Sequence, residues 1–208
     1  GLFSDLIISN YTSERKHSIN KLLELKKDGD SVSFDFRSYA EVDSYFLQLL
    51  EYFNEFFDPK LKIIHHYPHS WWPILYPLQE KRVMAKLKSE FYCVCSSNSS
   101  IDRYCREFNN AIGIKGIHTK DQRLHWNLNV FGEMIFKYYS DPEISKQVDE
   151  FFEKYKDFKV LDLRKLTELV EKKGKFRILV VKDSGLAENV FSAEIPLFQQ
   201  FKRLEGNR

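Results

Sequence analysis

The stretch KLKIIHHYPHSWWPILYP, residues 60–77, joins an apolar run to a cluster of ring-bearing side chains. It holds three of the six histidines and two of the three tryptophans in the chain. A short apolar run bounded by turn residues indicates a buried strand, here Leu61 to Ile64. Because side chains that follow such a strand lie at the edge of a sheet, this stretch is expected to fix the fold and to carry a candidate site.

The residues before this stretch predict a strand and then a long amphipathic helix. Residues 31–36 alternate apolar and polar side chains, as a half-buried strand does. Ser38 and Glu41 form a capping-box pattern, and apolar side chains then recur at helical spacing as far as Phe57. Strand, helix and strand within about 35 residues is the spacing of a βαβ unit.

The same patterns predict further elements towards the C-terminus. These are strands at 91–95, 111–117 and 176–181, a helix that begins at a Ser99–Asp102 capping box, a helical insertion or cover at 126–156, and an antiparallel hairpin that pairs 176–181 with 190–195. Strands that alternate with helices imply an α/β fold, with a mostly parallel mixed sheet and helices on both faces. We expect residues 1–208 to form a single α/β domain, as a piece of a longer protein.

Composition excludes several classes of protein. With 43% hydrophobic and 15% aromatic residues, the chain is expected to be globular and not disordered. Its 32 basic and 30 acidic side chains nearly cancel, so no overall field attracts nucleic acid or acidic lipid. Three cysteines give no disulfide framework and fit a reducing, cytoplasmic setting. No apolar run approaches the roughly 18 residues that span a bilayer, so no membrane association is expected.

Polar side chains that follow the predicted strands form one candidate ligand-binding site. In an open α/β sheet, ligands collect at the carboxyl ends of the strands because short loops and helix N-termini converge there. Cationic side chains, serine hydroxyls and backbone N–H groups together favour a small anionic ligand. The candidate residues are Arg37 after the first strand, His66, His69, Trp71 and Trp72 after the second, Ser97 and Ser99 after the third, and His118 and Lys120 after the fourth.

No motif of catalytic, metal or cofactor chemistry is complete. His65 and His66 are adjacent and would point to opposite faces of a strand, so at most one of them shares a site with His69. Neither cysteine nor acidic residues stand near them in the sequence, so a metal site is not predicted. The serine-rich turn at 96–100 lacks the glycines of a phosphate-binding loop. We therefore predict no catalytic residue, no metal and no cofactor.

Trp71 and Trp72, which stand beside Pro73, are compatible with two arrangements. Exposed, the two rings would form a recognition surface for a peptide or a stacked base. Buried, they would pack against the sheet, with each indole N–H bonded to an acceptor. The many Phe and Tyr residues of the chain favour burial.

Three functions remain open at this point. The leading one is a non-catalytic regulatory domain for signalling or transcription, which senses a small ligand or docks a protein partner or a second copy of itself. No helix-turn-helix pattern is present, so nucleic-acid binding through this segment is not expected. The first alternative is a hydrolase or phosphoryl-handling enzyme that uses His66 or His69 with His118. The second is single-stranded nucleic-acid binding through Trp71 and Trp72.

Overall fold

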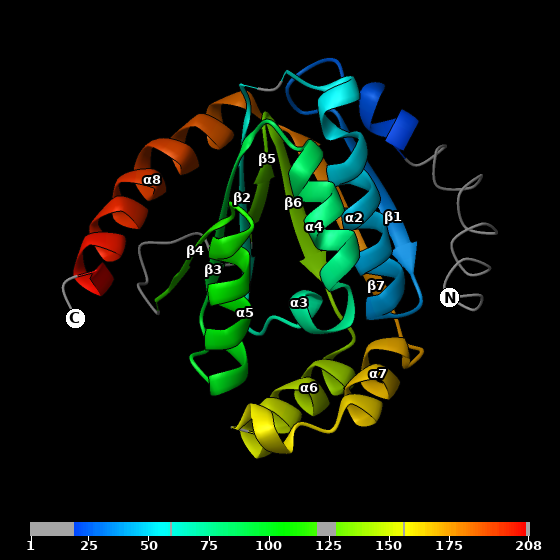
Figure 1. The fold of residues 1–208 in the computed structure, drawn as a ribbon. Coiled ribbons are helices and arrows are strands. Elements are labelled where there is room, and N and C mark those ends of the chain that lie inside the picture. The colour runs from blue at the N-terminus through cyan, green and yellow to red at the C-terminus, as the bar shows by residue number, and fades with distance from the viewer. Residues whose placement is uncertain (1–18, 59, 120–127, 156, 207–208) are drawn as a thin grey trace.

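A seven-stranded mixed sheet with helices on both faces forms the described part of the protein (Figure 1). The computed structural model describes residues 19–58, 60–119, 128–155 and 157–206. In chain order the elements are β1 (Ser31–Phe36), α2 (Tyr39–Phe56), β2 (Lys62–Tyr67), α3 (Trp72–Leu75), α4 (Pro77–Lys86), β3 (Glu90–Cys95), α5 (Ser100–Ala111), β4 (Lys115–His118), β5 (Leu128–Phe131), β6 (Met134–Tyr139), α6 (Pro142–Lys154), a 3-10 helix (Phe158–Val160), α7 (Leu163–Glu171), β7 (Phe176–Lys182) and α8 (Ser184–Gly206). The predicted α/β fold with a mixed sheet is confirmed, but the sheet is not mostly parallel, because four of its six strand pairs are antiparallel. None of the described helices combines the length and the apolar character that crossing a bilayer requires.

The strands follow the order β1-β7-β6-β5-β2-β3-β4. The pairs β2–β3 and β3–β4 are parallel, and the other four pairs are antiparallel. As a result β1, β6, β2, β3 and β4 point one way, and β5 and β7 point the other way. The carboxyl ends of the first group therefore meet at one edge of the sheet. β1 and β2 share a direction without pairing, because β7, β6 and β5 lie between them.

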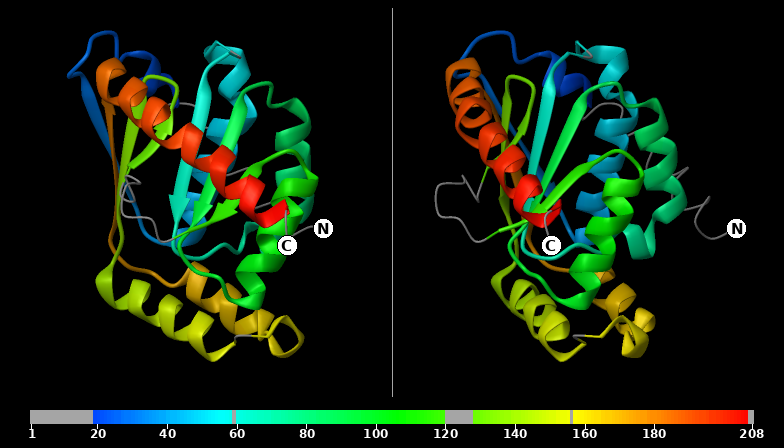
Figure 2. Two further views of the ribbon diagram at one scale, coloured as in Figure 1. Left: turned by 90° about the vertical axis from the view of Figure 1, so that its left-hand side faces the viewer. Right: turned by 60° about the vertical axis from the view of Figure 1, so that its left-hand side comes forward.

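Helices cover the two faces of this sheet unequally (Figure 2). The larger core lies under α2, α4 and α5 and contains Phe46, Phe53 and Phe131. The smaller core lies under α8, which crosses the other face diagonally and buries Val190 against Ile64 and Tyr92. Helices α6 and α7 cover neither face; they lie beyond the carboxyl ends of β1 and β6 (Figure 1).

The predicted start and inner face of α2 are confirmed, and the helix ends within one residue of the predicted end. Ser38 is the N-cap, and its hydroxyl accepts a hydrogen bond from the Glu41 N–H at 3.3 Å. The Glu41 carboxylate reaches one residue further back than a capping box requires and accepts from the Arg37 N–H at 2.8 Å. The helix buries Phe46 and Phe53 against the sheet.

The prediction of helix at 126–139 is wrong where the structure describes these residues. Residues 128–139 form the β5–β6 hairpin, in which Phe131 pairs with Met134. Gly132, at φ 61°, takes the first position of the two-residue turn, where a type II′ hairpin needs a positive φ. Because these central strands are covered on both faces, their side chains do not alternate and resemble a buried helix in sequence. The rest of the predicted cover is helical, as α6.

The prediction of a C-terminal hairpin is also wrong. Residues 190–195 belong to α8, so β7 pairs with β1 and β6 instead. Val190, Phe191 and Phe198 follow helical spacing, but Glu194 stands where that pattern expects an apolar residue. Glu194 is fully buried, so this acidic residue occupies a core position that its residue type does not indicate.

Candidate functional site

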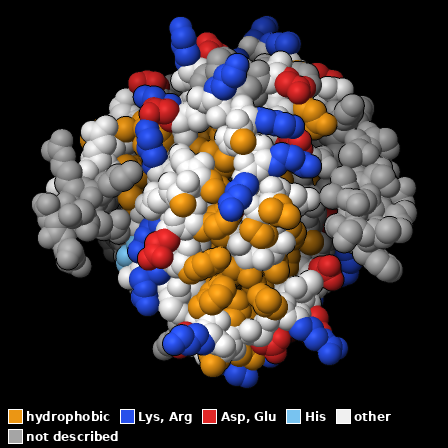
Figure 3. Space-filling model, in the orientation of Figure 1, with side chains coloured by type: hydrophobic (Ala, Val, Ile, Leu, Met, Phe, Trp, Pro, Cys, Tyr) orange, Lys and Arg blue, Asp and Glu red, His pale blue; other side chains and the backbone are white. Residues whose placement is uncertain are grey.

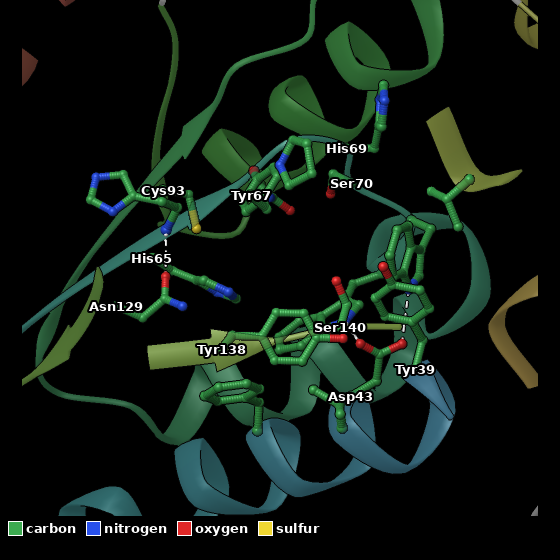
Figure 4. Close-up of a pocket in the computed structure, with 18 of the residues that line it drawn as sticks. Tyr39, Asp43, His65, Tyr67, His69, Ser70, Cys93, Asn129, Tyr138 and Ser140 are labelled. Carbon is green, nitrogen blue, oxygen red and sulfur yellow. Dashed lines mark hydrogen bonds between the residues drawn. The ribbon is translucent and has the colours of Figure 1, made fainter. Parts of the chain in front are cut away.

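A cavity of about 350 Å³ lies at the carboxyl edge of the sheet (Figure 4). β5, whose described residues begin at Leu128, lies between β2 and β6. Tyr67 on β2 and Tyr138 on β6 both line the cavity. Helix α2 contributes Asp43, and α6 contributes Val148. The expectation of a hollow at the strand carboxyl ends is supported by this arrangement.

Aromatic rings form most of the cavity wall, and the polar groups are few. The rings belong to Tyr39, Phe46, His65, Tyr67, Trp71, Trp72, Phe91 and Tyr138. The lining includes three acidic side chains, Asp43, Glu80 and Asp149, and no lysine or arginine from the described residues. A cavity of this size with apolar walls and a few convergent polar groups has the properties of a small-molecule site.

Asp43 holds both tryptophans of the quoted stretch in place. Trp71 Nε1 donates to Asp43 Oδ2 and Trp72 Nε1 donates to Oδ1, each at 2.8 Å (Figure 4). Burial raises the pKa of Asp43 to about 7, and the two indole hydrogen bonds limit that rise. Trp71 is only 8% exposed and Trp72 is partly buried, and both indole N–H groups are bonded. An exposed stacking surface made by both tryptophans is therefore contradicted.

His65, and not the predicted His66, packs its ring among the aromatic walls of the cavity. The ring lies 5.5 Å from Phe46 and 5.9 Å from Trp72, measured between ring centroids. Burial, with a smaller contribution from His66, lowers the pKa of His65 to about 3, so its ring is uncharged near neutral pH.

His66 lines the cavity, but its ring is buried and is directed to α8. His66 Nε2 lies 3.0 Å from Glu194 Oε2, and Nδ1 lies 2.6 Å from the carbonyl oxygen of Leu128. Nδ1 carries a proton, because a carbonyl oxygen can only accept a hydrogen bond. A second proton lies between Nε2 and the Glu194 carboxylate and belongs to one of these two groups. His65 and His66 point to opposite faces of β2, as predicted, but both line the cavity together with His69, so the prediction that at most one of them shares a site with His69 is wrong. Glu194 was not predicted as the partner of His66.

The predicted serine-rich anion site is occupied by an acidic side chain of the protein itself. Asp102 accepts from Ser99 Oγ at 2.6 Å, from the Ser99 N–H at 3.2 Å and from the Ser70 N–H at 3.2 Å. His69 Nδ1 lies 3.4 Å from the same carboxylate. Burial raises the pKa of Asp102, but hydrogen bonds from His69, Ser97 and Ser99 outweigh it, so the net shift is downward. An external anion would have to displace this carboxylate, so the expected anionic ligand is not supported here.

The remaining candidates that the structure describes do not line the cavity. Arg37 follows β1, which three strands separate from β2, and it pairs with Glu41 at 2.9 Å. His118 ends β4, opposite Cys95 of β3. Lys120 lies outside the described residues. Of the nine predicted residues the cavity thus gathers His66, His69, Trp71 and Trp72, and it does not include Arg37, Ser97, Ser99 or His118. No three His, Cys, Asp or Glu side chains of the described chain are placed to hold a metal ion.

Helix α6 covers the cavity and is held to its rim by side chains from two other elements. His69 stacks on Phe152 at 4.1 Å between ring centroids, and its Nε2 lies 3.4 Å from Asp149 Oδ1. Tyr39 and Ser145 share a hydrogen bond of 3.1 Å. Ser145, Val148 and Asp149 line the cavity, so a ligand inside it would touch the same helix that these contacts hold.

Sequence reasoning missed Asp43, although a signal was present. Asp43 stands on the inner face of α2, in line with the buried Phe46, Leu47 and Leu50. An acidic residue on an apolar helix face requires a buried partner, and the two nearby indoles were candidates for that partner.

The buried Glu80 gives the cavity wall a testable pH dependence. Glu80 is 3% exposed, and its Oε2 has no hydrogen bond among the described residues. Burial raises its pKa to about 8. The folded protein therefore keeps a proton that the unfolded chain releases near pH 4.5, so stability falls as pH rises from about 4.5 to 8.

We expect Glu80→Gln to remove this contribution. From pH 6 to pH 9, the unfolding free energy of the wild type should fall by about 2–3 kcal/mol more than that of the variant. Urea unfolding at the two pH values measures the difference. Glu188→Gln, on an exposed position of α8, is the control and should behave as the wild type. Equal losses in the wild type and Glu80→Gln would show that Glu80 is not held protonated.

Fold and site together define an α/β domain with an aromatic-lined cavity at the carboxyl edge of its sheet. No protein-family model matches the sequence, and a search of curated proteins finds no match either. Among solved structures, the chain is similar to TrmBL2, an archaeal chromatin protein whose structure was described as showing a novel mode of DNA binding. The two share 9% identity with a TM-score of 0.42, over 96% of this chain and 64% of that one. A likeness this distant does not indicate a shared function.

Proposed function

We propose that the protein is a non-catalytic regulatory domain that senses a small molecule in the cavity at the strand carboxyl ends. The observation that carries this proposal is the cavity itself, which has apolar walls, a few buried polar groups and a helix as its cover. Because α6 is held by contacts with the cavity rim, a bound molecule would change the stability of the packing of α6 on that rim. Ligand occupancy would thus be read out as the position or mobility of α6.

The absence of assembled catalytic groups among the described residues supports a binding function over a catalytic one. The two ring nitrogens of His69 face Asp102 and Asp149, and no hydroxyl or thiol nucleophile. Cys93 lines the cavity, but burial raises the pKa of its thiol far above the usual range, so the reactive thiolate is not formed near neutral pH. A hydrolase that uses His66 or His69 with His118 is therefore not favoured.

Docking of a protein partner is the second part of the proposal. Figure 3 shows hydrophobic side chains gathered over α3 and the start of α4, where Leu78 is 80% exposed. α3 begins with Trp72, whose indole N–H contacts Asp43 in the cavity. Cavity and apolar surface thus share one short helix, which is a direct route from ligand to partner.

A variant that fills the cavity tests the sensing function. Ser140 lines the cavity, so Ser140→Phe would place a ring inside it; Thr167→Phe adds the same ring at an exposed position of α7. We expect one chemical class in a metabolite panel to raise the melting temperature of the wild type and of Thr167→Phe by several degrees, without turnover. Ser140→Phe should show no such increase. If no compound raises the melting temperature of the wild type, or if Ser140→Phe responds equally, the proposal is wrong.

A further inference from the structure

We infer that the ligand of this cavity is a compact organic cation, an ammonium group carried on an apolar body, and that the ammonium group binds at Asp43. This inference depends on the proposed function, because it names the chemical class of ligand for the same cavity. It replaces the anionic ligand that the sequence suggested.

Asp43 is a buried carboxylate that no cation of the described residues contacts. It is 5% exposed, and its two hydrogen bonds come from neutral indole N–H groups. Among the described residues no lysine, arginine or histidine forms an ion pair with Asp43, and none of the residues lining the cavity is a lysine or an arginine. Each carboxylate oxygen accepts only one of these indole bonds and keeps a lone pair for a further donor. Since a buried charge without a partner is costly, a cationic ligand would supply the positive charge that pairs with Asp43.

Aromatic rings line the cavity around this carboxylate. Tyr39 lies 5.2 Å from Trp71 and 6.2 Å from Tyr138, measured between ring centroids. In Figure 4 the side chains of Tyr138 and Asp43 point toward one another across the lower part of the cavity. Ring faces attract cations, and ammonium groups are bound by such aromatic clusters in many proteins. Apolar walls also favour the body of the ligand, so the class is an organic cation and not a hydrated metal ion.

Other described titratable groups face Asp43 or share its cavity. They are Tyr39 on α2, His65, His66 and Tyr67 on β2, His69 after β2, Tyr76 before α4, Glu80 on α4, Cys93 on β3, Tyr138 on β6 and Asp149 on α6. Burial keeps the tyrosines protonated and lowers the pKa of His65 to about 3. The ring nitrogens of His66 and His69 face Glu194, the Leu128 carbonyl, Asp102 and Asp149, and not Asp43. None of these described groups therefore pairs a cation with Asp43, so its carboxylate, when ionised, favours a cation and opposes an anion.

Three probes of similar shape and different charge separate the alternatives: phenethylamine, 2-phenylethanol and 3-phenylpropanoate. Calorimetric titration at pH 8 should give the amine a dissociation constant roughly tenfold or more below that of the alcohol, with no detectable binding of the carboxylate. Asp43→Asn should bring the amine to the level of the alcohol and leave the alcohol unchanged. Asp149→Asn, at a side chain 61% exposed on the rim, is the matched control and should keep most of the preference.

A second measurement on the wild type covers the case in which Asp43→Asn does not fold. Because Asp43 has a raised pKa of about 7, the wild type should bind the amine several-fold more tightly at pH 8 than at pH 6, and the alcohol equally at both. If the alcohol or the carboxylate binds as tightly as the amine at pH 8, or if no probe binds, the inference is overturned. The proposed sensing function is decided separately, by the metabolite panel with Ser140→Phe.

Discussion

Replacing Glu194 by alanine is expected to destabilise the protein by about 3–5 kcal/mol, because it leaves the buried His66 imidazole without its carboxylate partner. Glu194 is fully buried on α8, and the His66 side chain is 1% exposed on β2, so water cannot replace the lost contact. This pair links α8, which covers one face of the sheet, to the central strand β2. Chemical unfolding monitored by circular dichroism measures the effect.

Two further variants show whether the effect comes from the pair. Glu194→Gln should cost clearly less than Glu194→Ala, because the amide can donate to His66 Nε2 while Nδ1 donates to Leu128. The double variant His66→Ala with Glu194→Ala should cost less than the sum of the single variants. Glu188→Ala, at an exposed position of the same helix, should stay within about 0.5 kcal/mol of the wild type. Additive losses would mean that the two side chains act independently.

Phe53→Ala is the other large loss that we expect, at about 3–5 kcal/mol. Phe53 is fully buried on α2, and its ring lies 4.8 Å from Phe57 and 6.2 Å from Phe131, measured between centroids. Truncation would remove the ring and leave a void between α2 and the hairpin β5–β6. Differential scanning calorimetry or urea unfolding gives the value.

The matched control for this truncation is Phe158→Ala. Phe158 is 40% exposed and packs mainly on Tyr104, so its removal should cost about 1 kcal/mol or less. A loss at Phe53 as small as the loss at Phe158 would show that α2 does not pack on the sheet in this register.

The sequence predicted the elements whose chemistry is local. Ser38 and Ser99 cap helices as expected, because a cap depends on residues three positions away. It failed at the β5–β6 hairpin and at α8, where long-range burial decides the pattern. Val130 and Phe136 lie in strands covered on both faces, and Glu194 takes a core position in which it contacts His66. Neither relation can be read from neighbouring residues.

The structure brings only some of the predicted site residues together in one cavity. His69, Trp71 and Trp72 directly follow a strand whose carboxyl end meets the cavity, so topology was sufficient to place them. Arg37 was misplaced because the order of strands within a sheet does not follow from the order in the chain. Asp43 was missed because its role depends on two indoles that approach from another element.

The most direct test is to follow the indole N–H resonances of Trp71 and Trp72 during a titration with phenethylamine. Both groups donate to Asp43, so a ligand that binds there must change their environment. Trp71→Phe and Trp72→Phe assign the two signals and separate them from Trp126, which lies outside the described residues. We expect both signals to shift and to saturate with the dissociation constant found by calorimetry. Binding that leaves both signals unmoved would place the ligand elsewhere and contradict the account.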